Sequence, residues 1–505
     1  MSRSDRTAFL LFCIIYTFIA FPMALLPTDL VGLVMYCLYL VLTLCIAFDL
    51  TEIILSITWV APPVLRAEGP PPRKTTAVLM VICDDSIEDC LRALLPLADA
   101  GYGVFVLDDS EVEIDLPCEV SKAVTHIRRD RRAGAKAGNL NNWLVQFGAV
   151  YEHAIILDSD SQMSVSCADA LLASAIHPAN AHVALFQSKT CSRTVESLFG
   201  AAMGSAARPR MRILERVHAR LGILLSAGHN VLVRLEPLRK LGGFDQTMTA
   251  EDTVLSLDFA SREWGISLVD AWSEDADPST IAGYNRRTIR WARQTVELFR
   301  CPWSATPYRL KLLLVRHLLN YLFPIFGTVM ILLSIWFGPS RLNETFALIV
   351  SALHFKVDFE ALGLAVWTSI LMTGLLLLLR VYLGIAEGVG MRRLILGILF
   401  SGANYSTLVV PLARGILTSA LGKKVVFLPT NSRTKMGRYS LLFRYEGLLS
   451  SFCLSAILVT GVVIHPASGL VGLTGVWLCC FLLSPLSLRL AEQFTAMKVA
   501  KDGIR

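Results

Sequence analysis

The chain has 505 residues, of which 54% are hydrophobic and only 17% charged, and its formal net charge is +6. Soluble domains carry about 25% charged residues, so this composition argues against a wholly soluble protein. Disorder is excluded, because a disordered chain needs low hydrophobicity and high charge. No nucleic-acid partner is expected, since the basic residues lie mostly beside apolar segments. The 12 cysteines include no CxxC spacing, which argues against a disulfide framework or a zinc site.

Two apolar runs near the N-terminus, 7–26 and 31–61, are each long enough to cross a lipid bilayer. The first lacks the cleavage site of a signal peptide and is followed at once by the second. A proline-rich stretch then leads to a segment with the composition of a soluble domain, 75–300. Four further apolar runs lie at 312–337, 362–386, 447–464 and 469–488. The sequence therefore predicts six membrane spans.

The stretch 394–421 is ambiguous, because polar residues and Pro411 interrupt it. It fits one or two amphipathic helices at the membrane interface, or a broken seventh span. With six spans, every segment rich in Lys and Arg falls on one side, including 423–438. This asymmetry favours six spans, with both termini and the 75–311 segment in the cytoplasm.

Short apolar runs bounded by turn residues recur in the soluble segment and predict strands at 77–82, 102–107, 153–157 and 183–187. Helical stretches are expected near 88–100 and 253–264. Alternating strands and helices are typical of an α/β fold with a doubly wound, mainly parallel sheet. In such sheets, ligands bind outside the carboxyl ends of the strands.

Acidic residues follow two of the predicted strands. Asp158 and Asp160 come directly after the strand at 153–157. Residues two apart on an extended segment project to one side, so their carboxylates can share a hard divalent ion such as Mg²⁺ or Mn²⁺. The alternative is a turn whose aspartates cap a helix. Asp108 and Asp109 follow the strand at 102–107, and taken alone this pair is more typical of an ordinary strand-end turn.

Basic and aromatic residues complete the set of candidates. Arg128, Arg129, Arg131, Arg132 and Lys136 would suit a diphosphate, although a solvated basic face is the alternative. His229 stands in an apolar environment, where a histidine is often structural. Glu251 and Asp252 begin a helical pattern, where acidic groups also favour the helix dipole. Arg287, Arg290 and Trp291 precede the return to the membrane.

The order of these motifs resembles the membrane-embedded family 2 glycosyltransferases, the group of bacterial cellulose, chitin and hyaluronan synthases. Ala250 replaces the Thr of that family's Thr-Glu-Asp motif, and Arg287 replaces the Gln of its Gln-x-x-Arg-Trp motif. The segment 228–230 (Gly-His-Asn) resembles the glucosyltransferase of osmoregulated periplasmic glucan synthesis. Phe427 and Thr430 match two positions of the cellulose synthase gating loop. Only a short tail follows residue 488, so no cyclic-di-GMP-binding PilZ domain is expected.

The resemblance implies a role for each motif. Asp252, paired with Glu251, is expected to be the catalytic base, and Asp158 and Asp160 to hold Mg²⁺ or Mn²⁺. The expected donor-binding residues are Asp108, Asp109, Lys136, Asp158 and Arg290. The expected acceptor-binding residues are His229, Arg287 and Trp291, and Phe427 and Thr430 are expected to close over the nucleotide.

The resemblance also implies an architecture. Residues 1–61 would form two spans and 75–300 a cytoplasmic GT-A-like domain. Residues 301–445 would hold interfacial helices, two spans and the gating-like loop, and 446–505 two further spans with a short tail. The expected place is the bacterial inner membrane.

The function implied is inverting transfer of a sugar, with UDP-glucose as the expected donor, to a growing β-linked polysaccharide that crosses the membrane. A periplasmic or outer-membrane export partner would fit that activity. Three alternatives stay open: transfer of single sugars to a lipid or short acceptor, polymer synthesis from UDP-GlcNAc, and a transporter or scaffold with an inactive α/β domain. The donor sugar, the linkage and the oligomeric state cannot be deduced from the sequence.

Overall fold

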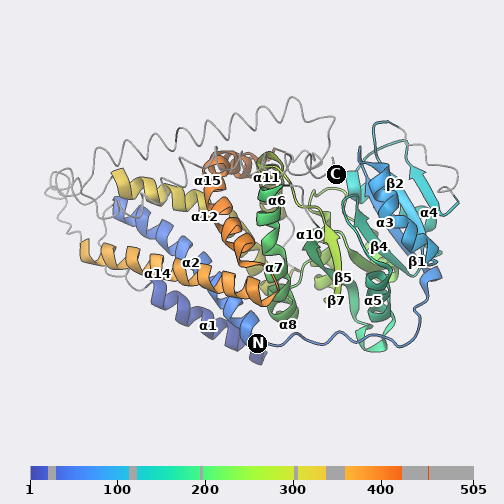
Figure 1. The fold of residues 1–505 in the computed structure, drawn as a ribbon, viewed down its shortest axis with the longest axis horizontal. Coiled ribbons are helices and arrows are strands. Elements are labelled where there is room, and N and C mark those ends of the chain that lie inside the picture. Colours follow the sequence, from blue (N-terminus) through green and yellow to red (C-terminus); the bar gives the residue numbers. More distant parts are fainter. Residues whose placement is uncertain are drawn as a thin grey trace, which may run out of the picture.

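The protein is described from a computed structural model, which covers residues 2–20, 30–112, 122–193, 197–300, 305–336, 359–423 and 453. The sheet and its covering helices form one part, and apolar helices form the other (Figure 1). The gating-like residues Phe427 and Thr430 and the predicted spans 447–464 and 469–488 lie outside the described residues.

The soluble part is built on a seven-stranded sheet with the strand order β3-β2-β1-β4-β6-β5-β7. All neighbouring strands are parallel except that β6 runs antiparallel to both β4 and β5. The strand bounds are β1 Thr76–Ile82, β2 Gly103–Asp108, β3 Val124–Arg128, β4 His153–Asp158, β5 Val183–Ser192, β6 Val231–Arg234 and β7 Gly265–Asp275. The predicted doubly wound, mainly parallel sheet is therefore confirmed.

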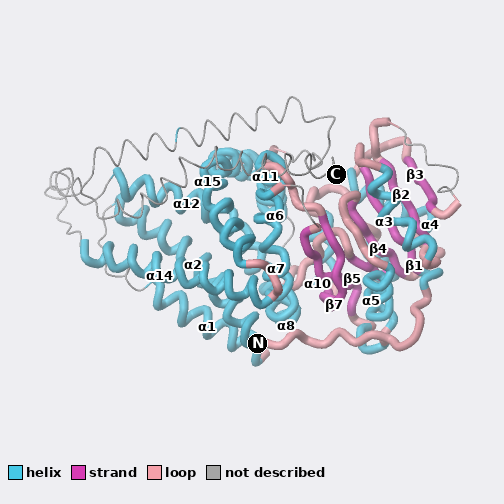
Figure 2. The backbone as a smooth tube through the Cα atoms, viewed as in Figure 1, coloured by secondary structure: helices cyan, strands magenta, loops and turns pink. Residues whose placement is uncertain are grey.

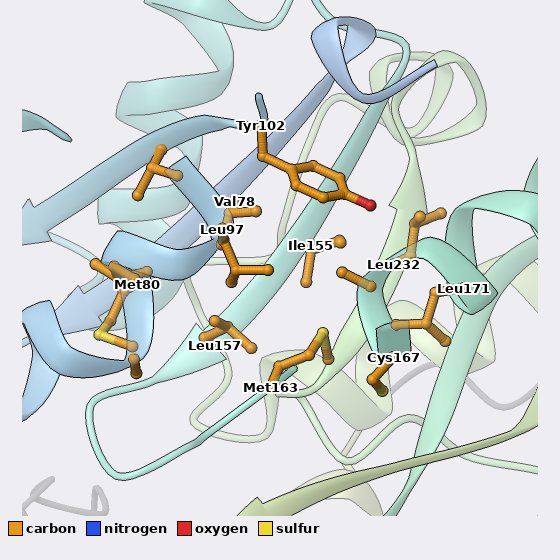
Figure 3. Close-up of a cluster of buried hydrophobic side chains, with 14 of the residues drawn as sticks. Val78, Met80, Leu97, Tyr102, Ile155, Leu157, Met163, Cys167, Leu171 and Leu232 are labelled. Atoms are coloured by element: carbon orange, nitrogen blue, oxygen red, sulfur yellow. The ribbon is translucent and has the colours of Figure 1, made fainter. Parts of the chain in front are cut away.

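Alternating side chains of the strands bury the two faces of the sheet. On β1, Val78 and Met80 face a core completed by α3 (Ile87–Asp99) and α5 (Val165–Ile176). Figure 3 shows that core, with Leu157 of β4 and Leu171 of α5 in it. Ala77 and Leu79 face the other core. Its helices are α4 (Ala135–Phe147), α9 (Leu235–Leu241) and α10 (Glu251–Ser261). Because both faces are covered, ligands can approach the strands only at their ends.

The predicted strands and helices lie within a few residues of the observed ones, but three strands were not predicted. β3 and β6 are short, and β7 carries acidic residues along an apolar pattern. β7 is an edge strand, where charged side chains reach solvent.

Helices that precede and follow the sheet domain in the sequence form the second part of the fold, which lies on one side of the sheet (Figure 1). α1 (Arg3–Ala20), α2 (Leu30–Thr58), α12 (Tyr308–Trp336) and α14 (Phe359–Ala386) pack together, with α2 in contact with the other three (Figure 1). The shorter helical pieces α6 (Leu198–Met203), α7 (Ala207–Ile213), a π-helical turn (Leu214–His218) and α8 (Ala219–Leu221) follow β5. α11 (Ile281–Leu298) links β7 to α12.

Three helices among the described residues are long and apolar enough to cross a membrane: Tyr36–Thr58, Tyr308–Val329 and Met391–Ala420. The first two coincide with predicted spans. The third is α15, a single helix from Met391 to Ala420, in the stretch that the sequence left ambiguous. α15 packs along α11 and α6 of the soluble part, so this stretch is continuous and tied to the sheet domain.

Charged side chains join the apolar helices near the soluble part. Arg316 of α12 pairs with Asp49 (2.9 Å) and Glu52 (2.6 Å) of α2, and Arg380 of α14 pairs with Asp49. His218 of the π-helical turn lies 2.9 Å from Glu52. Ionised groups in apolar helices are costly unless they are paired, so this network fixes α12, and with it α11, relative to α2.

The proline-rich linker, 59–72, is an extended loop along the soluble part (Figure 2). The backbone N–H of Ala67 donates to the carbonyl of Ala173 on α5, at 2.9 Å. Arg66 donates to the carbonyl of Asp270 on β7. These bonds hold the linker against the domain.

Candidate active site

The candidate site lies at the carboxyl end of the sheet, where four elements bring charged side chains together. β4 ends at Asp158, α4 begins just before Lys136, and α10 begins at Glu251. α11 supplies Arg290, which interacts electrostatically with Asp158, Asp160 and Glu251. Residues that are more than a hundred positions apart in the chain thus form one cluster, as the sequence motifs predicted.

Lys136 is the cation at the centre of the cluster. Its Nζ donates to Asp158 Oδ1 at 2.5 Å and to the Gly228 carbonyl at 2.9 Å, and it lies 4.0 Å from Glu251 Oε1. Burial opposes the charged form, but the nearby Asp158 and Glu251 carboxylates raise the pKa of the ammonium above its ordinary value. Lys136 therefore stays protonated and can meet a diphosphate.

Asp158 and Asp160 differ in their electrostatic surroundings. Burial opposes the ionisation of Asp158, but Lys136 holds the pKa of its carboxyl below the ordinary value. Burial, reinforced by the neighbouring Asp158 carboxylate, raises the pKa of Asp160 to about 6. Two oxygen-donor carboxylates that repel each other in this way are a donor set suited to a hard divalent ion.

A divalent ion at this position would need ligands beyond the two aspartates. The described residues contain no cluster of three or more His, Cys, Asp or Glu side chains arranged to hold a metal. Asp158 and Asp160 therefore fit an ion that completes its shell with ligand oxygens or water, as Mg²⁺ does when it binds phosphates.

Glu251 and Asp252 occupy the first turn of α10. Ala250 is the N-cap residue and makes no side-chain capping bond, whereas Asp252 Oδ1 accepts a hydrogen bond from the backbone N–H of Thr253 at 2.7 Å. Burial and the adjacent Asp252 raise the pKa of Glu251 to about 7, and burial also raises the pKa of Asp252. Carboxyls with raised pKa values in a polar cluster are candidates for acid–base chemistry.

The loop before β6 packs directly on Asp252. Gly228 has φ +79°, and a Cβ added to it would lie 2.9 Å from the Cβ of Asp252, so only glycine fits there. Beside it, His229 Nδ1 lies 3.4 Å from Asp275 Oδ1. Burial opposes its charge, but Asp275 and Asp158 raise the pKa of His229 to about 9. His229 is therefore a cation within the cluster rather than an isolated core histidine.

Asp108 and Asp109 lie at the end of β2, next to the cluster, but each is paired within the protein. Asp108 is fully buried and is held by His126 Nε2 (3.1 Å) and by Arg128 (3.0 Å). Asp109 forms a two-pronged pair with Arg129, at 2.8 and 2.6 Å. Two of the arginines that the sequence offered to a diphosphate thus fix these two aspartates, whereas Lys136, His229 and Arg290 interact electrostatically with Asp158.

α11 presents the two remaining candidates one turn apart. The Arg287 guanidinium lies 4.9 Å from the centre of the Trp291 ring and pairs with Asp277 at 2.9 Å. Trp291 remains 39% exposed. An exposed aromatic face beside a fixed cation can stack on the apolar face of a sugar ring.

Several residues of the site carried no sequence signal. Asp275 ends the unpredicted strand β7, and Gln187 of β5 donates to the carbonyls of His229 (2.9 Å) and Asn230 (3.1 Å). Asp85, after β1, lies beside Ser159 and Asp158, and burial raises its pKa. Recognising β7 as a strand would have placed Asp275 at the same edge as Asp158.

Parts of the chain are similar to known proteins. The family model described as "Glycosyl transferase family group 2" matches residues 153–383. A glucans biosynthesis glucosyltransferase H from Dickeya dadantii is 26% identical over 262 residues, which are 45% of this chain and 31% of that protein. Its counterpart from Pectobacterium carotovorum is 25% identical over 263 residues, 45% of this chain and 30% of that protein.

The chain thus matches about a third of the length of these curated relatives. Among solved structures, a mannosyltransferase from Pyrobaculum calidifontis, in complex with GDP-mannose and Mn²⁺, aligns with a TM-score of 0.41 at 16% identity. That alignment covers 67% of this chain and 98% of the mannosyltransferase. The segment 153–383, which includes β4, α10 and α11, matches the family 2 glycosyltransferase model, and the chain is homologous over 262 residues to the glucans biosynthesis glucosyltransferase of Dickeya dadantii.

Proposed function

We propose that the protein is a hexosyltransferase that moves glucose from UDP-glucose to a growing β-linked glucan, with inversion at the sugar carbon. The observation that carries the proposal is the cluster at the sheet edge. It combines the carboxylates of Asp158, Asp160, Glu251 and Asp252 with the cations of Lys136 and Arg290. The relatives named as glucosyltransferases of glucan synthesis support glucose as the sugar and a glucan as the acceptor.

The chemistry requires a base for the acceptor hydroxyl and cations for the leaving group. Asp252 accepts the hydroxyl proton while the acceptor oxygen attacks the sugar C1 and the bond from C1 to the diphosphate oxygen breaks. Lys136 and Arg290 offset the charge that develops on the departing UDP. Mg²⁺ or Mn²⁺, held by Asp158 and Asp160, would supply further neutralisation of the diphosphate.

The acceptor would approach from the side of α11. Trp291 offers an exposed ring, and Arg287 holds that ring through the stack described above. Tyr321 of α12 interacts electrostatically with Arg210 of α7, which in turn interacts with Arg287. These polar and aromatic groups support a path for the glycan from Trp291 towards the apolar helices, with Phe427 and Thr430 proposed to close over the nucleotide.

The apolar helices support a multi-pass protein of the bacterial inner membrane, with the sheet domain in the cytoplasm. Reporter fusions test this placement. A cytoplasmic reporter should be active after Arg300 and after Arg438. A reporter after Arg438 that is active only outside the cytoplasm would refute the six-span topology.

Donor screening tests the activity. Purified protein in detergent is incubated with UDP-glucose, UDP-GlcNAc or UDP-glucuronate and Mg²⁺ or Mn²⁺, and UDP release and labelled product are measured. We expect turnover with UDP-glucose and a long β-glucanase-sensitive product. Short or lipid-extractable products would instead indicate a non-processive transferase. Turnover of UDP-GlcNAc would indicate a different polymer synthase. The absence of turnover with every donor would indicate a transporter or scaffold.

A further inference from the structure

The carboxylate of Asp275, at the end of β7, gathers two separate segments of the site. One oxygen, Oδ1, accepts hydrogen bonds from Ser161 Oγ (2.9 Å) and Asn230 Nδ2 (2.6 Å), and it is the atom facing His229 Nδ1 at 3.4 Å. Backbone bonds between Gln162 and Glu274, at 2.8 and 2.9 Å, hold the end of β7 beside the segment after Asp160. A single side chain thus connects the segment 158–161 with the loop 228–230.

That loop has an unusual backbone. Gly228 and Asn230 both have positive φ, +79° and +53°. A non-glycine residue with positive φ costs free energy and persists only when its surroundings hold it. Besides Asp275, the loop is held by Gln187, which donates to two of its carbonyls, and by Lys136, which donates to the Gly228 carbonyl.

The loop in turn limits where the Asp252 side chain can lie. Gly228 approaches Asp252 so closely that an added Cβ would lie 2.9 Å from both its Cβ and its Oδ2. Across the same contact, Ser226 N–H donates to Ser256 Oγ of α10 at 2.9 Å. A shift of the loop would therefore change the position of the carboxylate that takes the acceptor proton.

We propose that Asp275 is a positioning residue for sugar transfer: by holding His229 and Asn230 on one carboxylate oxygen, it keeps the 228–230 loop packed against Asp252. This inference rests on the proposed function, since it takes Asp252 as the base of the transfer step. Asp275 itself need not touch the donor or the acceptor.

The test compares kcat, the KM for UDP-glucose, UDP affinity and thermal stability in variants of the full-length protein. We expect Asp275→Ala to lower kcat by about tenfold or more, because a displacement of about 1 Å in a reacting group can cost up to about 10²-fold in rate. The donor KM and UDP affinity should change much less. Asp275→Asn keeps an acceptor oxygen for Ser161 and Asn230, so its kcat should lie between those of Asp275→Ala and the wild type.

Two further variants separate the contact of Asp275 with the 228–230 loop from its contact with the 158–161 segment. Asn230→Gly tolerates the positive φ but removes the amide, and combining it with Asp275→Ala should lower kcat by less than the product of the single effects. Ser161→Ala should lower kcat only slightly. A Ser161→Ala loss equal to that of Asp275→Ala, with weaker UDP binding, would overturn the inference, because Asp275 would then act on the 158–161 segment.

Glu274→Gln is the matched control, since it removes a neighbouring, exposed carboxylate and should leave kcat unchanged. Wild-type kcat in Asp275→Ala would overturn this inference while leaving the proposed function intact. Absence of UDP-hexose turnover in the wild type would instead overturn the proposed function itself.

Discussion

Asp252→Asn is the substitution that most sharply separates a catalytic role from a structural one. In the folded protein, Asp252 is the second residue of α10, and Ala250, not Asp252, is the N-cap. Asp252 Oδ1 accepts hydrogen bonds from Thr253 N–H (2.7 Å) and from Thr253 Oγ1 (3.4 Å), and the amide oxygen of Asn can accept the same bonds. The substitution removes a charge and a base but keeps the shape.

The expected changes in stability and in rate follow from these contacts. Losing a carboxylate from the first turn of a helix costs about 0.3–1 kcal/mol through the helix dipole. The neighbouring Glu251 repels that carboxylate, which offsets part of the cost. Stability should therefore change by less than about 1 kcal/mol. Loss of a general base lowers the rate by about 10²–10⁴-fold, and a 100-fold loss corresponds to about 2.7 kcal/mol of activation free energy.

One preparation should be used for thermal unfolding, UDP affinity and UDP-glucose turnover. We expect near-normal unfolding and UDP affinity with turnover at least about 100-fold lower. Asp258→Asn, on the same helix but outside the site, is the control and should keep its turnover. Near-normal turnover in Asp252→Asn would refute the assignment of the base, and a large loss of stability would show that the structural reasoning is wrong.

Three other predictions concern the same domain. The folded protein binds the Glu251 proton more tightly than the unfolded chain does, since the pKa rises from an ordinary value of 4.5 to about 7. The protonated carboxyl thus contributes stability that is complete below about pH 4.5 and is lost as the pH rises through about 7. Glu251→Gln should therefore show a smaller fall in melting temperature between pH 5 and 8 than the wild type. Parallel plots of melting temperature against pH for the two proteins would contradict this. Asp160→Ala should abolish turnover, and it should weaken UDP binding only when Mg²⁺ or Mn²⁺ is present. Titration calorimetry with and without EDTA measures that binding. An equal loss of UDP affinity without metal would exclude the metal role. Trp143→Ala should lower the free energy of unfolding in urea by about 3–5 kcal/mol, because the Trp143 ring is 1% exposed and packs against Phe105 and Tyr151. A decrease below about 1 kcal/mol would contradict this packing.

The chemical groups of the candidate site and the class of the fold can be deduced from the local pattern of the sequence. Apolar runs such as 153–157 identify buried strands, because a strand covered on both faces needs continuous hydrophobic residues. An acidic pair directly after such a strand must lie at the carboxyl edge of the sheet, so Asp158 and Asp160 could be assigned without coordinates. The order of motifs was enough to predict that Glu251, Asp252 and Arg290 would join them.

Which of these groups pair with one another depends on the folded arrangement of the strands. β2 and β3 are neighbours with Asp108 opposite Arg128, and that register pairs Asp108 with an arginine that the sequence offered to a diphosphate. β7 hydrogen bonds beside β5, which carries Asp275 to a site more than a hundred residues away in sequence. The physical reason is that a charge's partner depends on strand order and register, which are set by long-range packing, whereas hydrophobic pattern and residue type are local properties of the chain.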